Sequence, residues 1–117
     1  MVTCDLPFPP SANGLFLNVA GKGRIKTRRY ADWRTEAAWL ISIAKKRRTE
    51  GAYGLTVLAG RPDKRKRDLG NILKAIEDAL VEGGAVEDDS HLECLEMRWE
   101  PGLTGVRVIV LPTTRRE

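Results

Sequence analysis

The stretch RPDKRKRDLGNILKAIEDALVEGGAVEDD, residues 61–89, decides how this chain is interpreted. Four consecutive cations lie near its start, at 64–67, and they repel one another unless solvent or a polyanion lies beside them. Apolar residues then recur at helical spacing over 71–80, and Gly83-Gly84 marks the end of the helix that this spacing predicts. Three acids at 87–89 close the stretch. A basic surface, an amphipathic helix and a group of acids therefore share one short segment.

The polar side of the predicted helix points to chemistry on phosphates. One line along it consists of Asp68, Asn71, Lys74 and Asp78. Asp68 would meet Asp88 or Asp89 if the chain folds back across the helix, and carboxylate oxygens are ligands that Mg²⁺ prefers. Lys74 is placed to stabilise charge that builds on a phosphate, while the basic run holds a nucleic-acid backbone. The pattern predicts a metal-dependent site for phosphodiester hydrolysis.

Two sets of residues also carry a family resemblance. The first is Pro9-Pro10-Ser11-x-Asn13 near the start of the chain. The second consists of Arg61-Pro62-Asp63, residues 64–68, Asn71, Lys74, Asp78-Ala79-Leu80, Gly84 and Asp88-Asp89. In this order they resemble the RusA family of Holliday junction resolvases. The resemblance implies a small homodimeric α/β endonuclease that requires Mg²⁺ and cuts four-way DNA junctions by paired nicks.

Site residues follow from the resemblance position by position. Asp68 and Asp89 would be catalytic carboxylates that bind the metal, with Asp88 beside them as a further ligand, and Lys74 would be the essential lysine. Phosphate contacts are expected from the basic run, and the polar side chains of the two motifs are expected nearby. The full set of expected DNA-binding residues is Asn13, Arg61, Lys64, Arg65, Lys66, Arg67 and Asn71.

One position departs from the family pattern. The family reads Asp-x-Asp-Asn where this chain reads Asp68-Leu69-Gly70-Asn71, so Gly70 stands where a second catalytic carboxylate is expected. Glycine supplies no ligand and costs roughly 1 kcal/mol relative to alanine within a helix. Three alternatives remain open: a weakened metal site, replacement by another acid such as Glu87 or Asp63, or a junction-binding protein with little or no nuclease activity. A structural domain whose basic run only maintains solubility would leave the acids and Lys74 unexplained.

Composition sets the wider limits. A chain of 117 residues predicts one domain, residues 1–117, and a fold of this size often gains stability from dimerisation. The net charge of +4 favours anionic partners, and most of the excess lies in 24–29, 45–48 and 61–67. No membrane-length apolar run or signal-peptide pattern is present, so we expect a cytoplasmic protein without membrane contact. Cys4 and Cys94 are expected to be buried and reduced.

The chain reads as α/β (α+β): a mixed sheet of about four strands with two helices packed on one face. Strands are predicted at 1–8, 53–60, 90–99 (with a possible bulge) and 106–110, with a hairpin turn at 101–105 and a hairpin or mobile loop within 15–29. The helices are predicted at 30–48, with the cations of 45–48 in its last turn, and from 71 onward. Trp39 and Ile43 are expected to widen the apolar stripe of the first helix.

Two further residue sets carry weaker expectations. His91 is the one histidine and follows the acids, but a lone exposed histidine is usually neither a general base nor a ligand. Leu58 and Ile109 are apolar residues at the alternate positions of their strands, opposite to most of the apolar side chains. They would therefore face away from the helices. We expect them to serve a dimer interface.

Overall fold

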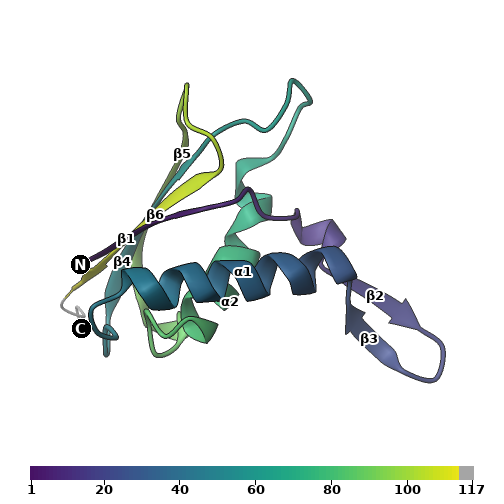
Figure 1. The fold of residues 1–117 in the computed structure, drawn as a ribbon, viewed down its shortest axis with the longest axis horizontal. Coiled ribbons are helices and arrows are strands. Elements are labelled where there is room, and N and C mark those ends of the chain that lie inside the picture. The colour runs from purple at the N-terminus through teal and green to yellow at the C-terminus, as the bar shows by residue number, and fades with distance from the viewer. Residues whose placement is uncertain (114–117) are drawn as a thin grey trace.

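The computed structural model describes residues 1–113 and shows an α+β fold (Figure 1). A four-stranded mixed sheet has the order β1-β6-β4-β5, and a two-stranded hairpin and two helices complete the chain. The strands are β1 (Val2–Leu6), β2 (Phe16–Val19), β3 (Gly23–Lys26), β4 (Tyr53–Ala59), β5 (Leu92–Trp99) and β6 (Val106–Pro112). The helices are α1 (Arg28–Ala44) and α2 (Leu73–Glu82), with short 3-10 helices η1 (Ala12–Gly14), η2 (Leu69–Ile72) and η3 (Asp89–His91).

The predicted mixed sheet with two helices on one face is confirmed. Alternate residues of β1, β4 and β6 are buried, as period-2 spacing requires, and both helices lie on the face that they form (Figure 1). α1 packs against α2 and β1 through Tyr30, Trp33, Ala37 and Ile41, all of which are buried. The opposite face is more open, and Leu58 and Ile109 are only half-buried there.

The connection at 101–105 is a turn, but the predicted hairpin is wrong. β5 pairs parallel with β4, whereas β6 pairs antiparallel with the other edge of β4, so β5 and β6 are not neighbours. The connecting chain crosses the end of β4 and is held there by Glu100 N–H donating to Ala59 O (2.8 Å) and Gly60 N–H donating to Gly105 O (2.8 Å). Local turn residues predict a reversal of the chain but not which strand it pairs with.

The bulge is confirmed in the same pair of strands. Tyr53 pairs with Leu92 and Gly54 pairs with Cys94, so β5 carries one more residue than β4 at that point. Cys4 is buried, but Cys94 is exposed, which contradicts the expectation for the second cysteine. The reason is that β5 is an edge strand whose residues remain mostly open to solvent.

α1 differs from its prediction at both ends. It begins at Arg28, where the Thr27 hydroxyl caps the helix by accepting from Tyr30 N–H (3.2 Å). It ends at Ala44, because Lys45 already has an extended backbone (ψ 140°). The cations of 45–48 therefore follow the helix instead of occupying its last turn. They lead to Thr49, whose N–H donates to Ala85 O (2.8 Å) beside the end of α2.

The apolar stripe of α1 is also narrower than predicted. Trp39 is 62% exposed and Ile43 is 60% exposed, so neither belongs to the core. The neighbouring α2 and β1 cover only one side of α1, and these two residues fall outside that contact.

The segment at 15–29 contains the predicted hairpin, formed by β2 and β3 and projecting from the body of the fold (Figure 1). Positive φ angles occur at Gly21 in its turn and at Gly23, the first residue of β3. No helix within residues 1–113 has the length and apolarity that crossing a membrane requires.

Candidate nucleic-acid interface and active site

The two sequence motifs meet in space. Phe8 and Ser11, from the segment before η1, share a cavity of about 190 Å³ with residues around the start of η2. Its lining consists of Phe8, Ser11, Lys66, Arg67, Asp68, Asn71 and Ile72. Trp33 Nε1–H donates to Pro7 O (2.8 Å) and fixes the first segment against α1. The fold thus places the opening motif beside Asp68 and the end of the basic run.

We call residues 61–67 the basic loop; it leaves the carboxyl end of β4 and enters η2. Asp63 organises it, because this carboxylate accepts from Arg65 N–H (3.0 Å), Arg65 Nε (3.1 Å), Arg67 Nε (3.1 Å) and Arg67 Nη2 (2.7 Å). The hydrogen bond from Arg67, followed by those from Arg65, holds the pKa of Asp63 well below its usual range. Both of its oxygens are occupied by Arg donors, so Asp63 is poorly suited to replace the carboxylate missing at Gly70.

The two ends of the basic loop are joined by stacked side chains. The Phe8 and Trp99 rings are stacked, 6.3 Å apart at 6°. Arg61 Cζ lies 4.4 Å from the centroid of Trp99, and Arg67 Cζ lies 5.7 Å from the centroid of Phe8. These distances are in the range for aromatic stacking and for attraction between a cation and a ring. Arg61 and Arg67 therefore have structural contacts in addition to their charge.

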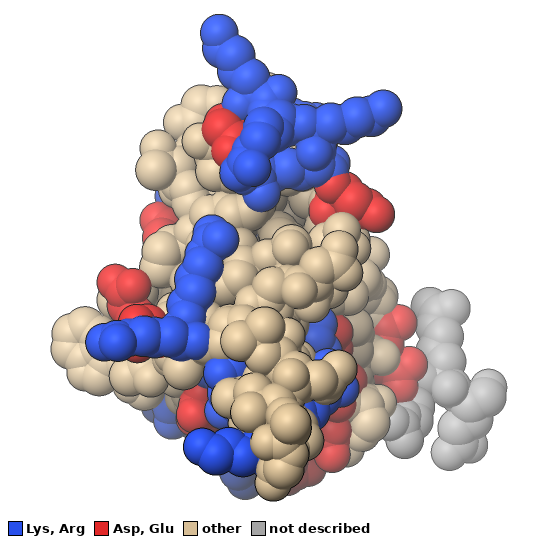
Figure 2. Space-filling model, turned by 90° about the vertical axis from the view of Figure 1, so that its right-hand side faces the viewer, with Lys and Arg blue, Asp and Glu red and all other residues tan. Residues whose placement is uncertain are grey.

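Other cations of the basic loop remain available. The side chains of Lys64 and Lys66 are exposed and form no ion pair or hydrogen bond with any residue in 1–113. Figure 2 shows Lys and Arg side chains gathered at the upper end of the molecule, where Figure 1 places the basic loop. Such a surface fits a phosphate backbone.

Asp68 is held at the start of η2. Its Oδ1 accepts from Gly70 N–H (3.1 Å), and its carbonyl accepts from Asn71 N–H (3.1 Å). Its Oδ2 has no partner among the described residues 1–113. Gly70 has no positive φ, and a Cβ built there would meet only Asp68 Oδ1, at 3.6 Å. The backbone therefore gives no reason for glycine at this position.

Asp88 repeats this arrangement at the start of η3. Its Oδ1 accepts from Ser90 N–H (2.9 Å), and that hydrogen bond, followed by the contact with Asp89, lowers the pKa of Asp88. η3 packs against α2, and η2 packs against both α2 and β5. The elements that carry Asp68, Asp88 and Asp89 thus share α2 as a common neighbour.

The metal centre itself stays a prediction. Within residues 1–113 no three His, Cys, Asp or Glu side chains come close enough together to hold a metal ion. The aspartates supply the hard oxygen atoms that Mg²⁺ requires, but they are not assembled into one ligand group. The side chains present fit Mg²⁺ in their chemistry and not in their arrangement.

Sequence reasoning missed two residues beside these acids. Burial, and after it the charge of Asp89, raises the pKa of Glu77 on α2. Burial, and after it the charges of Glu77, Asp89 and Asp88, raises the pKa of Tyr53 to about 12. The Tyr53 hydroxyl is buried and has no hydrogen-bond partner within residues 1–113. The available signal was that Glu77 follows Lys74 by three residues and so shares its side of the helix.

Lys74 lies on α2 and is tied to the core by an ion pair. Its Nζ lies 3.1 Å from Asp78 Oδ1, while Asp78 Oδ2 accepts from the Tyr30 hydroxyl (2.8 Å). Arg34 lies 4.0 Å from the same carboxylate and pairs with Glu82 at 2.8 Å. The Lys74 side chain remains exposed, so its predicted contact with phosphate is sterically open.

The remaining candidates from the sequence are Glu87, His91 and Asn13. Glu87 Oε2 is 3.8 Å from Arg48, and its Oε1 is 3.7 Å from His91 Nδ1, a nitrogen with no hydrogen-bond partner in residues 1–113. Asn13 is exposed in η1, which packs against η2 and α2. None of Glu87, His91 and Asn13 has a contact within residues 1–113 that assigns it a role.

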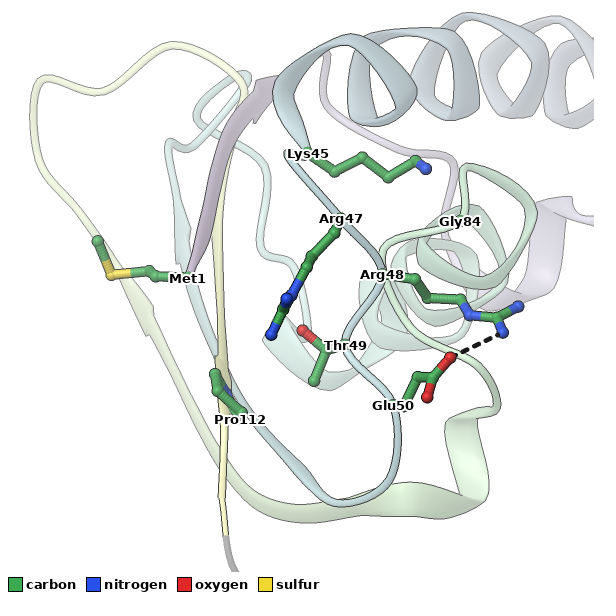
Figure 3. A pocket seen from close by; sticks show the side chains of 8 residues that line it. All are labelled: Met1, Lys45, Arg47, Arg48, Thr49, Glu50, Gly84 and Pro112. Atoms are coloured by element: carbon green, nitrogen blue, oxygen red, sulfur yellow. Dashed lines mark hydrogen bonds and ion pairs between the residues drawn. The ribbon is translucent and has the colours of Figure 1, made fainter.

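A larger cavity, of about 850 Å³, lies elsewhere, at the end of α1 (Figure 3). Its lining consists of Met1, Lys45, Arg47, Arg48, Thr49, Glu50, Gly84 and Pro112. Arg48 pairs with Glu50 (3.3 Å), as the dashed line in Figure 3 marks. None of the predicted site residues lines this cavity.

Comparison with known proteins decides the family. The family model described as Endodeoxyribonuclease RusA matches residues 7–110. The chain belongs to the RusA family. The crossover junction endodeoxyribonuclease RusA of Enterobacteria phage HK97 is 31% identical over 110 residues, which span 88% of this chain and 82% of that protein. The predicted family is confirmed, and the RusA match includes both motifs that meet around Asp68.

Proposed function

We propose that this RusA-family chain is a Mg²⁺-dependent endodeoxyribonuclease that resolves four-way DNA junctions by paired nicks, acting as a homodimer. The observation that carries the proposal is the meeting of the opening motif, the basic loop and Asp68 around one cavity. Family membership supports the reaction, since the family model and the phage relative are both named as endodeoxyribonucleases.

In this proposal Asp68 and Asp89 are the catalytic carboxylates, and with Asp88 they would hold the metal, which requires their side chains to come closer together than in the structure described above. A bound Mg²⁺ would polarise the scissile phosphate and supply a hydroxide. Lys74 stabilises the charge that develops on the phosphate. DNA is held by Asn13, Asn71 and the cations of the basic loop, namely Arg61, Lys64, Arg65, Lys66 and Arg67. A dimer presents two such sites, one for each strand that is cut.

Nicking of a synthetic four-way junction in Mg²⁺ tests these roles. The wild type is compared with Asp68→Asn and Asp89→Asn, each of which removes one carboxylate charge at nearly constant shape. Asp32→Asn is the matched control, because Asp32 is exposed and its one ion pair in the described part of the chain, with Arg28, is long (3.9 Å). We expect the first two variants to lose at least about 10²-fold in rate and the control to keep it. Equal cleavage by all four proteins would remove Asp68 and Asp89 from catalysis.

A second candidate function is junction binding without cleavage. Gly70 favours it, because glycine supplies no ligand at the position where the family pattern has a carboxylate. Gly70→Asp separates the two functions, and the open space around Gly70 allows the new side chain. If only Gly70→Asp nicks the junction, the natural chain is a binding protein. If the wild type already nicks it, the chain is a nuclease despite Gly70.

A further inference from the structure

We propose that Asp63 is a positioning residue that holds the basic loop in one fixed shape, which we call the clasp. In this clasp Lys64 and Lys66 contact DNA phosphates with side chains that have no other partner in residues 1–113, while Arg61, Arg65 and Arg67 hold the loop in shape in addition to facing the DNA. The inference rests on the proposed binding of junction DNA and assigns different tasks to cations that the sequence presents as equivalent.

The first contact that holds the basic loop in shape is the exposed carboxylate of Asp63, which accepts several hydrogen bonds. Four N–H groups of Arg65 and Arg67 point at Asp63, at distances between 2.7 and 3.1 Å. Two donors from the Arg67 guanidinium reach separate oxygens, which is the bidentate geometry that fixes orientation as well as distance. Arg65 and Arg67, two and four residues after Asp63, are thereby both bound to its carboxylate.

The stack of side chains fixes the ends of the same loop. In order, its members are Arg61, Trp99, Phe8 and Arg67. The first and last are the end residues of the basic loop, while Trp99 ends β5 and Phe8 follows β1. The loop is thus attached to two strands that lie at opposite edges of the sheet.

These contacts separate the cations into two groups. The Arg67 side chain is only 24% exposed and is engaged on two sides, by Asp63 and by Phe8. Arg65 is 78% exposed but donates to the same carboxylate. Lys64 and Lys66, by contrast, have no partner within residues 1–113. A fixed pair of unengaged lysines can contact phosphates without the entropy cost of ordering the loop on binding.

Substitution of Asp63 distinguishes the clasp from simple charge attraction. If Asp63 is only a negative charge near DNA, Asp63→Asn will tighten binding to every DNA. If Asp63 positions the loop, Asp63→Asn will release Arg65 and Arg67, favour non-specific binding, and lower the ratio of junction to duplex affinity. We expect that ratio to fall by about fivefold or more. Asp32→Asn makes the same charge change outside the loop and should leave the ratio unchanged.

Substitution of Lys64 or Lys66 should have a different effect from substitution of Arg67. Lys64→Gln and Lys66→Gln should each lower the salt dependence of junction binding by about 0.9 in the slope of log K against log salt. Arg67→Gln should reproduce the loss of selectivity of Asp63→Asn, and the double variant should be no worse than either single variant, since both break one contact. Additive losses, or an unchanged salt slope in both lysine variants, would overturn the proposal.

Trypsin tests the clasp without DNA. We expect trypsin to cut the wild type within 64–67 several-fold more slowly than it cuts Asp63→Asn. The control Asp32→Asn should be cut at the same rate as the wild type. Equal cutting of all three proteins would overturn the clasp whether or not junctions are bound. If the wild type shows no preference for junctions, the proposed function fails, and the trypsin result still decides whether Asp63 fixes the loop.

Discussion

The carboxylates of Asp68 and Asp88 are oriented by the same kind of local hydrogen bond. Each accepts the amide N–H two residues further along, at 3.1 and 2.9 Å, and each caps a 3-10 turn. Asp and Asn side chains favour this turn because it satisfies a backbone donor within the segment itself. The orientation of both acids is therefore set by their own neighbours, while Gly70, between Asp68 and the rest of η2, is free of backbone strain.

The hydrogen bond between Tyr30 and Asp78 gives a prediction at this scale. Tyr30→Phe removes the donor of a 2.8 Å bond to a carboxylate at a residue that is fully buried, and we expect a loss of about 1.5 kcal/mol in the free energy of unfolding. Tyr53→Phe is the matched control, because the Tyr53 hydroxyl has no partner within residues 1–113. That variant should be neutral or slightly stabilised. Urea unfolding followed by tryptophan fluorescence measures both, and equal losses would contradict the assignment.

Titration of the same tyrosines gives a prediction for alkaline pH. Burial raises the pKa of Tyr30 and of Tyr53 to about 12, and the chain has no other tyrosine. An unfolded chain releases these protons near pH 10. Between about pH 10 and 12, deprotonation of the two phenols lowers the free energy of the unfolded chain but not that of the folded one. The stability that the neutral phenols contribute is therefore complete below pH 10 and is lost as pH rises toward 12.

Tyrosinate absorbance checks this directly. The native protein should show no step near pH 10, while protein in urea should show the whole step there. A native step near pH 10 would contradict the burial of both rings.

At the scale of elements, the sequence predicted local structure better than contacts between elements. The alternation in β4 and β6 and the glycines after α2 defined those segments correctly, because each signal depends on near neighbours alone. The pairing of β5 could not be predicted, since it depends on the chain crossing the end of β4. The exposure of Trp39 likewise depends on how α1 meets α2 and β1, which helical spacing does not specify.

The crossing at the end of β4 makes Gly60 a sensitive position. A Cβ at Gly60 would lie 1.7 Å from Leu103 O, so Gly60→Ala must displace the connection that follows β5. We expect a loss of more than about 2 kcal/mol in the free energy of unfolding. Gly102→Ala, in the same connection, has open space but a φ of +83°, and should lose only about 1 kcal/mol. Chemical denaturation compares the two, and a smaller loss for Gly60→Ala would contradict this account of the crossing.

At the scale of the whole molecule, the candidate site combines segments from both halves of the chain. Sequence motifs identified Asp68, the basic loop and the opening motif, and the fold brings these together in one cavity. The tasks that we propose for the individual cations could not be predicted, because the Phe8–Trp99 pair forms only when β1 and β5 lie in the folded sheet. The contacts of Asp63 with Arg65 and Arg67 are local, but they depend on how the loop turns in the folded chain. Glu77 and Tyr53 were missed for the same reason, since their link to Asp89 exists only in the folded chain.

A gel shift of the wild type with a four-way junction and with duplex DNA of the same sequence, in the absence of Mg²⁺, tests the central claim most directly. The account predicts that the junction is bound at a protein concentration at least about tenfold lower than the duplex, and that excess duplex does not displace it. Equal affinity for the two DNAs, with complete displacement by duplex, would contradict junction recognition by this surface.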